Sequence, residues 1–168
     1  MYRDHGKYQP SVLKEYPFWT LLLHERQRYL GRAVVWLARA GDMQRFSGLL
    51  NEELVKLRDI TQEYEAVLDR LGFKPDHMNY AMLGNEVHLH NGHGHMHIVP
   101  RYKEPREFKG VTFVDDRWGK NHSPETLFEL DPGVRSGLIE TLEAEIKRLQ
   151  WGDVDFEANL SNTYTGQT

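Results

Sequence analysis

Short apolar runs separated by polar turns dominate the first part of the chain. Trp19–Leu23 and Ala33–Leu37 are runs of five apolar or weakly polar residues, the kind of run that forms a buried strand. The stretch between them is polar and ends in Leu30 and Gly31, which suits a turn. The two runs are therefore expected to pair as a hairpin.

The pattern then changes from strand spacing to helix spacing. Mostly apolar side chains recur at intervals of three and four residues between Leu50 and Leu71, which predicts one buried stripe on a long helix. Asn51 is the expected N-cap, and Gly72 suits the C-terminal stop. The expected stripe consists of Leu50, Leu54, Leu57, Thr61, Tyr64, Leu68 and Leu71.

A second helix is predicted near the end of the sequence. Asp131 is the expected cap, and Pro132 occupies the first helical position, where its missing N–H is harmless. Its apolar stripe is expected to consist of Val134, Leu138, Leu142, Ile146 and Leu149.

Further strands are predicted between the two helices, over residues 77–83 and 94–99. Pro100 is expected to end the second of these, and residues 111–114 are expected to add a short edge strand. Strands combined with a long helix and a C-terminal helix predict an α+β fold with an antiparallel sheet of about five strands. We expect a single domain over 1–168, with polar extensions over 1–17 and 152–168.

Composition narrows the classes of function. The 168 residues include no cysteine, which excludes disulfides and thiolate chemistry, and no apolar run approaches the length of a membrane span. The net charge of −4 and mixed charge pattern argue against a nucleic-acid partner, which needs a broad basic face. The polar N-terminus lacks the apolar run of a secretion signal, so we expect a cytoplasmic protein. Five of the nine histidines fall between His88 and His97.

Three of these histidines alternate along one predicted strand. His93, His95 and His97 are two residues apart, so a strand directs all three to one face at intervals of about 6.6–6.8 Å. Met96 and Ile98 then point to the opposite face, into the core. The sequence therefore predicts a row of imidazoles on an open face of the sheet.

Two chemistries suit such a row. In the first, the imidazoles bind a metal ion, with ligands drawn from His88, His90, His93 and His95, or with His122; a straight row fits two zinc ligands well and three poorly. In the second, the row binds phosphate. A neutral imidazole is a good nucleophile near pH 7, and its neighbours can donate hydrogen bonds or protonate a leaving group, so no metal is required.

The same segment resembles a known signature. His–x–His–x–His followed by Ile98, Val99, Pro100, Arg101 and Tyr102 resembles the motif of the histidine-triad (HIT) superfamily, in the form found in bacterial hydrolases of the diadenosine tetraphosphate hydrolase type. Residues 79–85 and 113–124 are similar to the same subgroup. The resemblance implies the HIT fold and hydrolysis or transfer at the α-phosphate of an AMP- or GMP-containing nucleotide, with no required cofactor.

The resemblance also implies a role for each histidine of the triad. His95 would be the nucleophile, His97 would contact the phosphate and assist the leaving group, and His93 would orient His95 or bind phosphate.

Further positions are implied to contact the nucleotide. The nucleoside would lie between the first hairpin and the long helix. The residues expected to line the nucleotide site are Asn85, Asn79, Leu22, His24, Arg32, Lys120 and Asn121.

Four features depart from the family pattern, and two of them concern candidate site residues. Arg32 stands where many members carry a histidine, and the stretch before the triad is longer than usual and adds His88 and His90. Members of the family pair through the long helix and a sheet edge, so a homodimer is implied.

Overall fold

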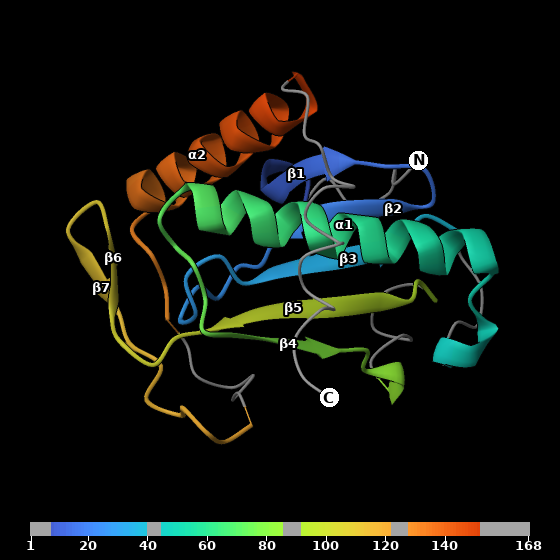
Figure 1. Cartoon of the computed structure of the whole chain (residues 1–168), viewed down its shortest axis with the longest axis horizontal. Coiled ribbons are helices and arrows are strands. Elements are labelled where there is room, and N and C mark those ends of the chain that lie inside the picture. Colours follow the sequence, from blue (N-terminus) through green and yellow to red (C-terminus); the bar gives the residue numbers. More distant parts are fainter. Residues whose placement is uncertain (1–7, 40–44, 86–91, 122–127, 152–168) are drawn as a thin grey trace, which may run out of the picture.

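The structure is a computed structural model that describes residues 8–39, 45–85, 92–121 and 128–151. Its centre is an antiparallel sheet with the strand order β1-β2-β3-β5-β4. The predicted hairpin is confirmed, because Trp19 pairs with Leu37 and Leu23 with Ala33. Figure 1 shows the sheet; its strands are β1 (Val12–Glu15), β2 (Trp19–Leu23), β3 (Ala33–Leu37), β4 (His77–Ala81) and β5 (His95–Arg101).

Two helices build the core against one face of this sheet. Helix α1 (Asn51–Arg70) covers the sheet and runs roughly along its strands, and α2 (Pro132–Trp151) packs beside α1, near β1 (Figure 1). The sheet and both helices contribute side chains that are buried between them. Among these side chains are Leu21, Val35, Met96 and Ile98 from the sheet, Leu57, Ile60, Tyr64 and Leu68 from α1, and Leu138 and Leu142 from α2.

Helix α1 confirms the predicted element but shifts its buried stripe. Leu50, expected inside the stripe, is the N-cap in place of Asn51, and half of its surface is exposed. The buried carboxylate of Glu53 accepts a hydrogen bond from the Leu50 N–H at 2.9 Å and pairs with Arg39. The stripe therefore starts with a charged residue that sequence spacing cannot mark as buried. Its members are Glu53, Leu57, Ile60, Tyr64, Val67 and Leu68.

Helix α2 starts as predicted. The Asp131 carboxylate accepts hydrogen bonds from the N–H groups of Gly133 and Val134, at 2.8 and 3.4 Å, which satisfies two donors of the first turn. Leu138, Leu142, Ile146 and Leu149 are buried as expected, and Val134 is half-buried.

Three predicted details of the strands are wrong. Val12–Glu15, within the expected N-terminal extension, forms β1. Pro100 does not end β5; pairing with β3 stops at Ile98, so the missing N–H of Pro100 interrupts no ladder on that side. The expected edge strand over residues 111–114 is observed as β7 (Val111–Phe113). It does not join the main sheet but pairs with β6 (Arg106–Phe108) in a separate hairpin.

The turn between β2 and β3 depends on a glycine. Gly31 has a φ of +78°, and a Cβ at this position would lie 2.8 Å from Leu68 Cδ2 on α1. Both the backbone conformation and the close approach of the helix therefore require glycine. The hydroxyl groups of Tyr64 and Tyr102 donate to the carbonyls of Gly31 and Leu30, at 2.7 and 2.8 Å, and fix this turn from the core side.

Candidate active site

Strand alternation separates the histidines from the core. Met96 and Ile98 belong to the core beneath α1, so His95 and His97 lie on the opposite face of β5. On β3, Trp36 stands opposite His95 and Val34 opposite His97, and Leu22 of β2 stands opposite Val34. We call this side of the sheet, with His95, His97, Trp36, Val34 and Leu22, the histidine face.

Aromatic rings form a continuous chain across the histidine face. The rings of His95 and His97 lie edge to face with centroids 5.1 Å apart. The Trp36 ring stacks on His95 at 5.3 Å, and the His24 ring lies 5.6 Å from His97. The two triad histidines are therefore close enough to act on one phosphate group, and a third imidazole from another segment joins them.

The histidine face is covered, although the sequence predicted an open face. His95 is 2% exposed and His97 7% exposed. Two residues from the N-terminal part of the chain, Tyr8 and Val12, pack against the small apolar cluster of Leu22, Val34 and Trp36. The Tyr8 ring centroid lies 5.6 Å from that of Trp36. Tyr8 and Val12 therefore cover part of the apolar surface around Leu22, which was expected to line the nucleotide site.

The third member of the triad occupies a different environment. His93 precedes β5 and is half-buried, and its Nδ1 atom lies 2.8 Å from the carbonyl oxygen of Leu37, at the end of β3. The structure therefore brings His95 and His97 together on the strand, while His93 is anchored to the neighbouring strand where β5 begins.

A second pair of residues approaches the histidines from the turn between β2 and β3. His24 and Arg32 flank this turn, and the His24 N–H donates to the Arg32 carbonyl at 3.0 Å. The guanidinium-bearing side chain of Arg32 is only 3% exposed. Arg32 is two residues from Val34, so alternation places it on the histidine face, diagonal to His97. A permanent positive charge is thus built into this face.

The electrostatic environment keeps His24 neutral. Burial, together with the nearby charge of Arg32 and the His97 ring, lowers the pKa of His24 to about 2. Its Nδ1 atom accepts a hydrogen bond from the Arg26 N–H at 3.0 Å. The neutral ring therefore carries its proton on Nε2 and presents a hydrogen-bond donor at every physiological pH.

Several solved structures with a similar arrangement of strands and helices are histidine-triad proteins. A histidine-triad protein from Marinobacter aquaeolei VT8 is 19% identical, with a TM-score of 0.61 over 89% of this chain and 98% of that one. A zinc-bound histidine-triad family protein from Mycobacterium smegmatis is 18% identical, with a TM-score of 0.54 over 83% and 85%. Plasmodium falciparum diadenosine triphosphate hydrolase is 12% identical, with a TM-score of 0.51 over 84% and 78%.

The chain has the histidine-triad fold. The predicted α+β class and the expected resemblance in fold are both confirmed. No protein-family model matches the sequence, and no curated protein matches it significantly. At these identities the likeness establishes the fold, and the chemistry depends on this chain's own residues.

Within the histidine-triad fold, the position of Leu22 corrects one expectation. Leu22 is buried on the histidine face, whereas α1 covers the other face. A nucleoside that contacts Leu22 therefore cannot lie between the first hairpin and the long helix. It has to lie on the side away from α1.

The two candidate asparagines occupy different places. Asn79 of β4 stands opposite Val99, and its neighbour Tyr80 reaches Glu65 on α1. Alternation therefore places Asn79 on the histidine face, where it is half-buried. Asn85 follows β4 and is exposed. Of the two, Asn79 has the position that directs a side chain toward the histidines.

A buried ion pair holds the loop that contains Lys120 and Asn121. The Arg101 guanidinium donates to both carboxylate oxygens of Asp115, at 2.6 and 3.0 Å, and to the carbonyls of Arg117 and Lys120. Arg101 is therefore used in shaping this loop. The side chains of Lys120 and Asn121 are exposed, and the structure does not bring them into contact with the two buried histidines.

An ion pair joins this loop to the turn that carries His24. Arg28 Nε donates to Asp116 Oδ1 at 3.1 Å, and the Arg101 guanidinium lies 5.3 Å from the centre of the Tyr29 ring. The loop thus lies beside the β2–β3 turn, at the rim of the site.

The metal-ligand candidates are described only in part. His88, His90 and His122 lie outside the described residues. Within the described ranges, no group of three or more His, Cys, Asp or Glu side chains is arranged to hold a metal ion. The same part of the chain contains no helix that is both long and apolar enough to span a membrane.

Sequence patterns did not reveal two residues that support the site. Gln27 and Arg135 both donate to the carbonyl of His24, at 2.7 and 3.1 Å. Gln27 lies in a polar turn and Arg135 on a distant helix, so neither belongs to a motif. Arg101 could have been suspected, because it has the same parity along β5 as His95 and His97.

The low pKa of His24 predicts a pH-dependent stability. The unfolded chain binds a proton at His24 near pH 6.5, whereas the folded protein does not, so the free energy of unfolding should fall as the pH drops below about 6.5. The contribution of this group approaches about 1.4 kcal/mol per pH unit. Urea unfolding between about pH 7.5 and pH 5 measures it.

In the variant His24→Asn, the free energy of unfolding should depend less steeply on pH, because one proton fewer is taken up on unfolding. An identical slope in wild type and His24→Asn would contradict the buried, neutral state of His24.

Proposed function

We propose that the chain is a nucleotide hydrolase or nucleotidyl transferase that acts on the α-phosphate of an AMP- or GMP-containing conjugate. The supporting observation is the pair of histidines on one face of β5, with ring centroids 5.1 Å apart, in a chain with the histidine-triad fold. The buried guanidinium of Arg32 on the same face supplies a fixed positive charge that suits a phosphate ligand.

The proposed reaction has two displacements at phosphorus. An imidazole nitrogen of His95 attacks the α-phosphorus, the bond from this phosphorus to the leaving group breaks, and the leaving group takes a proton. Water, or an acceptor phosphate in a transferase, then attacks the same phosphorus and returns a proton to the group that protonated the leaving group, and the phosphorus–nitrogen bond breaks. His95 returns to its neutral form. Dividing one displacement into two lowers the barrier of each, and the reaction at His95 requires no metal.

The neighbouring residues have complementary proposed roles. His97, in ring contact with His95, binds the phosphate oxygens and protonates the leaving group, while His93 steadies the start of β5 through Leu37. The Nε2–H group of His24 donates to the sugar–phosphate part of the nucleotide.

The remaining candidates form the surroundings of this site. Asn79 contributes an amide on the histidine face, Leu22 forms part of the apolar surface for the nucleoside, and Lys120 and Asn121 lie on the loop at the rim. A nucleoside that lies on Leu22 and Trp36 has to displace Tyr8 and Val12. Binding is therefore proposed to open the N-terminal side of the histidine face.

Two alternatives rest on the same residues. A zinc-binding protein would use His88, His90, His93 and His95, and a structurally similar histidine-triad protein is zinc-bound. A nucleotide-binding regulator would use the same face without turnover. The bond between the His93 Nδ1 atom and the Leu37 carbonyl fits both sites, because a metal-binding imidazole commonly donates its other ring N–H to a backbone carbonyl.

Replacing His95 tests the proposed reaction. His95→Asn should lower the rate of hydrolysis of a dinucleoside polyphosphate or an AMP phosphoramidate by about 10³-fold or more, because no nucleophile remains. The control is His77→Asn, which changes an exposed histidine at the start of β4. It should retain the wild-type rate. Turnover by His95→Asn at the wild-type rate would overturn the mechanism, and stoichiometric zinc whose removal abolishes activity would favour the metal alternative.

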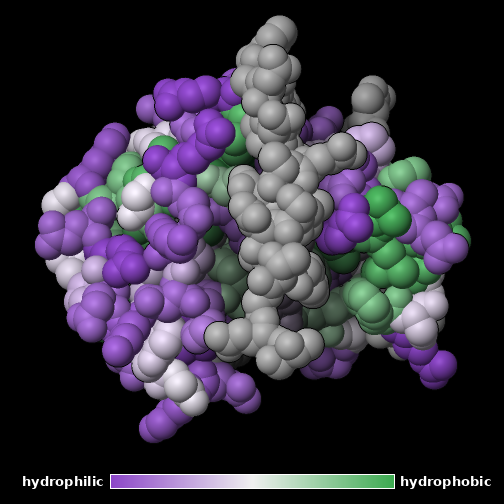
Figure 2. Space-filling view, viewed as in Figure 1, coloured by the Kyte–Doolittle hydropathy of each residue, from purple (hydrophilic) through white to green (hydrophobic). Residues whose placement is uncertain are grey.

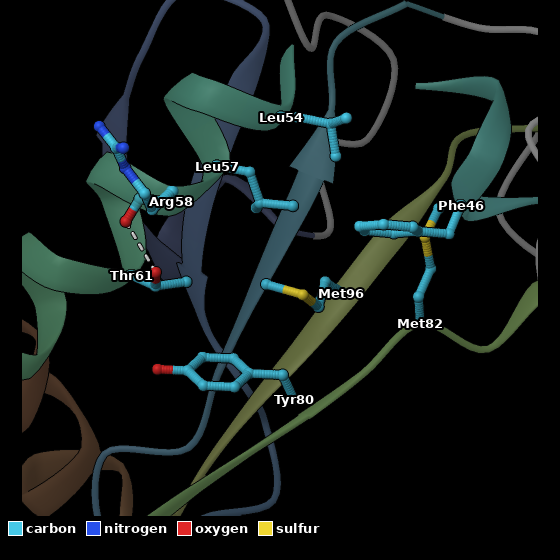
Figure 3. Close-up of a pocket in the computed structure, with 8 residues that line it drawn as sticks. All are labelled: Phe46, Leu54, Leu57, Arg58, Thr61, Tyr80, Met82 and Met96. Atoms are coloured by element: carbon cyan, nitrogen blue, oxygen red, sulfur yellow. Dashed lines mark hydrogen bonds between the residues drawn. The ribbon is translucent and has the colours of Figure 1, made fainter. Parts of the chain in front are cut away.

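We also propose a homodimer that pairs through α1 and the edge strand β4. An apolar groove of about 400 Å³ lies on the helix side of the sheet, and Figure 3 shows Phe46, Leu57, Tyr80 and Met96 pointing into it. Figure 2 shows hydrophobic residues gathered at the end of the molecule where α1 begins. The groove is lined by Phe46, Leu54, Leu57, Arg58, Thr61, Tyr80, Met82 and Met96.

Sedimentation equilibrium tests the dimer. Phe46 is 56% exposed and Val55 52% exposed, so the double variant Phe46→Glu with Val55→Glu should convert a dimer into a monomer by placing charge in the apolar contact. Val114 is similarly exposed but lies next to β7, so Val114→Glu should remain dimeric. A wild-type protein that stays monomeric at micromolar concentrations would rule out this assembly.

A further inference from the structure

A fully buried glutamine organises the turn between β2 and β3. The side-chain amide nitrogen of Gln27 donates to the carbonyl of His24 at 2.7 Å and to the carbonyl of Arg32 at 2.7 Å. Its side-chain oxygen accepts a hydrogen bond from the Gly31 N–H at 3.0 Å. Both amide hydrogens and the oxygen are therefore used, and none of the side chain is exposed to solvent.

These three bonds connect the two residues that flank the turn. His24 and Arg32 are already joined by the bond from the His24 N–H to the Arg32 carbonyl. Gln27 adds a second bridge between them through their carbonyl groups. The spacing between the His24 imidazole and the Arg32 guanidinium is thus tied to the carboxamide of one residue.

Other contacts support the turn without joining these two residues. Tyr102 donates to the Leu30 carbonyl, and Tyr64 donates to the Gly31 carbonyl. Arg135 reaches the turn from α2 and donates to the carbonyls of His24 and its neighbours in sequence and to Ser11. These groups hold the turn against the core, whereas Gln27 sets its internal geometry.

We propose that Gln27 is a positioning residue of the nucleotide site, which holds the His24 imidazole and the Arg32 guanidinium as a fixed pair beside His97. This inference rests on the proposed function, because it assigns the pair to the sugar–phosphate part of the nucleotide. A donor and a cation held in place before binding lose little freedom when the ligand arrives, which raises affinity. Gln27 acts through these two residues and does not touch the ligand.

The inference is tested with Gln27→Met, which keeps the length of the side chain but removes all three hydrogen bonds. The dissociation constant of AMP, measured by calorimetry, should rise about tenfold or more, because His24 and Arg32 have to be ordered on binding. Gln27→Glu is a second variant for the case that Gln27→Met does not fold. It keeps the acceptor for the Gly31 N–H and loses both donated bonds, so the same rise is expected.

Tyr102→Phe is the matched control for stability. It removes one buried hydrogen bond to the same turn but leaves the bridge between His24 and Arg32 intact. Its melting temperature should fall, while its dissociation constant for AMP should stay within about twofold of the wild type. An equal loss of AMP affinity in Tyr102→Phe and Gln27→Met would show that Gln27 matters only for stability and would overturn the inference.

The ring nitrogens of His24 provide a measurement that does not depend on nucleotide chemistry. In ¹⁵N NMR spectra, wild-type His24 should show a single neutral tautomer, with the proton on Nε2. In Gln27→Met the Nδ1–H and Nε2–H tautomers should exchange, because the backbone that fixes the Arg26 N–H relative to the ring is released. If wild-type protein binds no AMP, the proposed function fails, and an unchanged His24 spectrum in Gln27→Met would separately refute the positioning role.

Discussion

The burial of both faces of β5 is the constraint on which the candidate site depends. Met96 and Ile98 pack beneath α1, and this fixes His95 and His97 on the opposite face. Moving His95 and His97 to the other face would require a shift of the strand register by one residue, which would also move Met96 and Ile98 out of the core. Removing one buried apolar side chain from the core costs about 1.5–3 kcal/mol. The core therefore determines where the imidazoles point, and their ring contact follows from the pairing of β5 with β3 and β4.

The proposed phosphate site also requires a positive charge, on a buried face of an acidic protein. With a net charge of −4, the chain cannot attract phosphate through its overall field. Arg32 supplies a local charge instead, and the tight turn at Gly31 delivers it. Burial lowers the pKa of His24 most, and the repulsion of a second cation by Arg32 lowers it further, so this imidazole stays neutral. One imidazole is thus reserved as a hydrogen-bond donor.

Much of the fold followed from the sequence because its elements have strong local patterns. The apolar runs gave β2 and β3, the capping residue Asp131 gave the start of α2, and the alternation around Met96 gave the two faces of β5. The features that were predicted wrongly, the start of the buried stripe on α1 and the place of β7, depend on contacts that the local sequence pattern does not show. Glu53 is buried because Arg39 pairs with it, and β6 joins β7 through a turn in which Lys109 and Gly110 both have positive φ.

The site was predicted less completely for the same reason. The triad spacing predicted that His95 and His97 share one face of a strand, but it could not show that Tyr8 packs over Trp36 or that Gln27 ties His24 to Arg32. These contacts join segments whose sequences carry no shared motif. The apolar groove lies on the other side of the sheet, lined by Met96, so a dimer formed there would leave the histidine face available to a nucleotide.

The central claim is that phosphorus becomes bonded to His95 during turnover. It is tested most directly by mixing the protein with a dinucleoside polyphosphate labelled at the α-phosphorus, stopping the reaction in alkali, which preserves phosphorus–nitrogen bonds, and sequencing the labelled peptide. The account predicts that the label is attached to His95. Turnover of the substrate with the label on another residue, or on no residue at all, would contradict it.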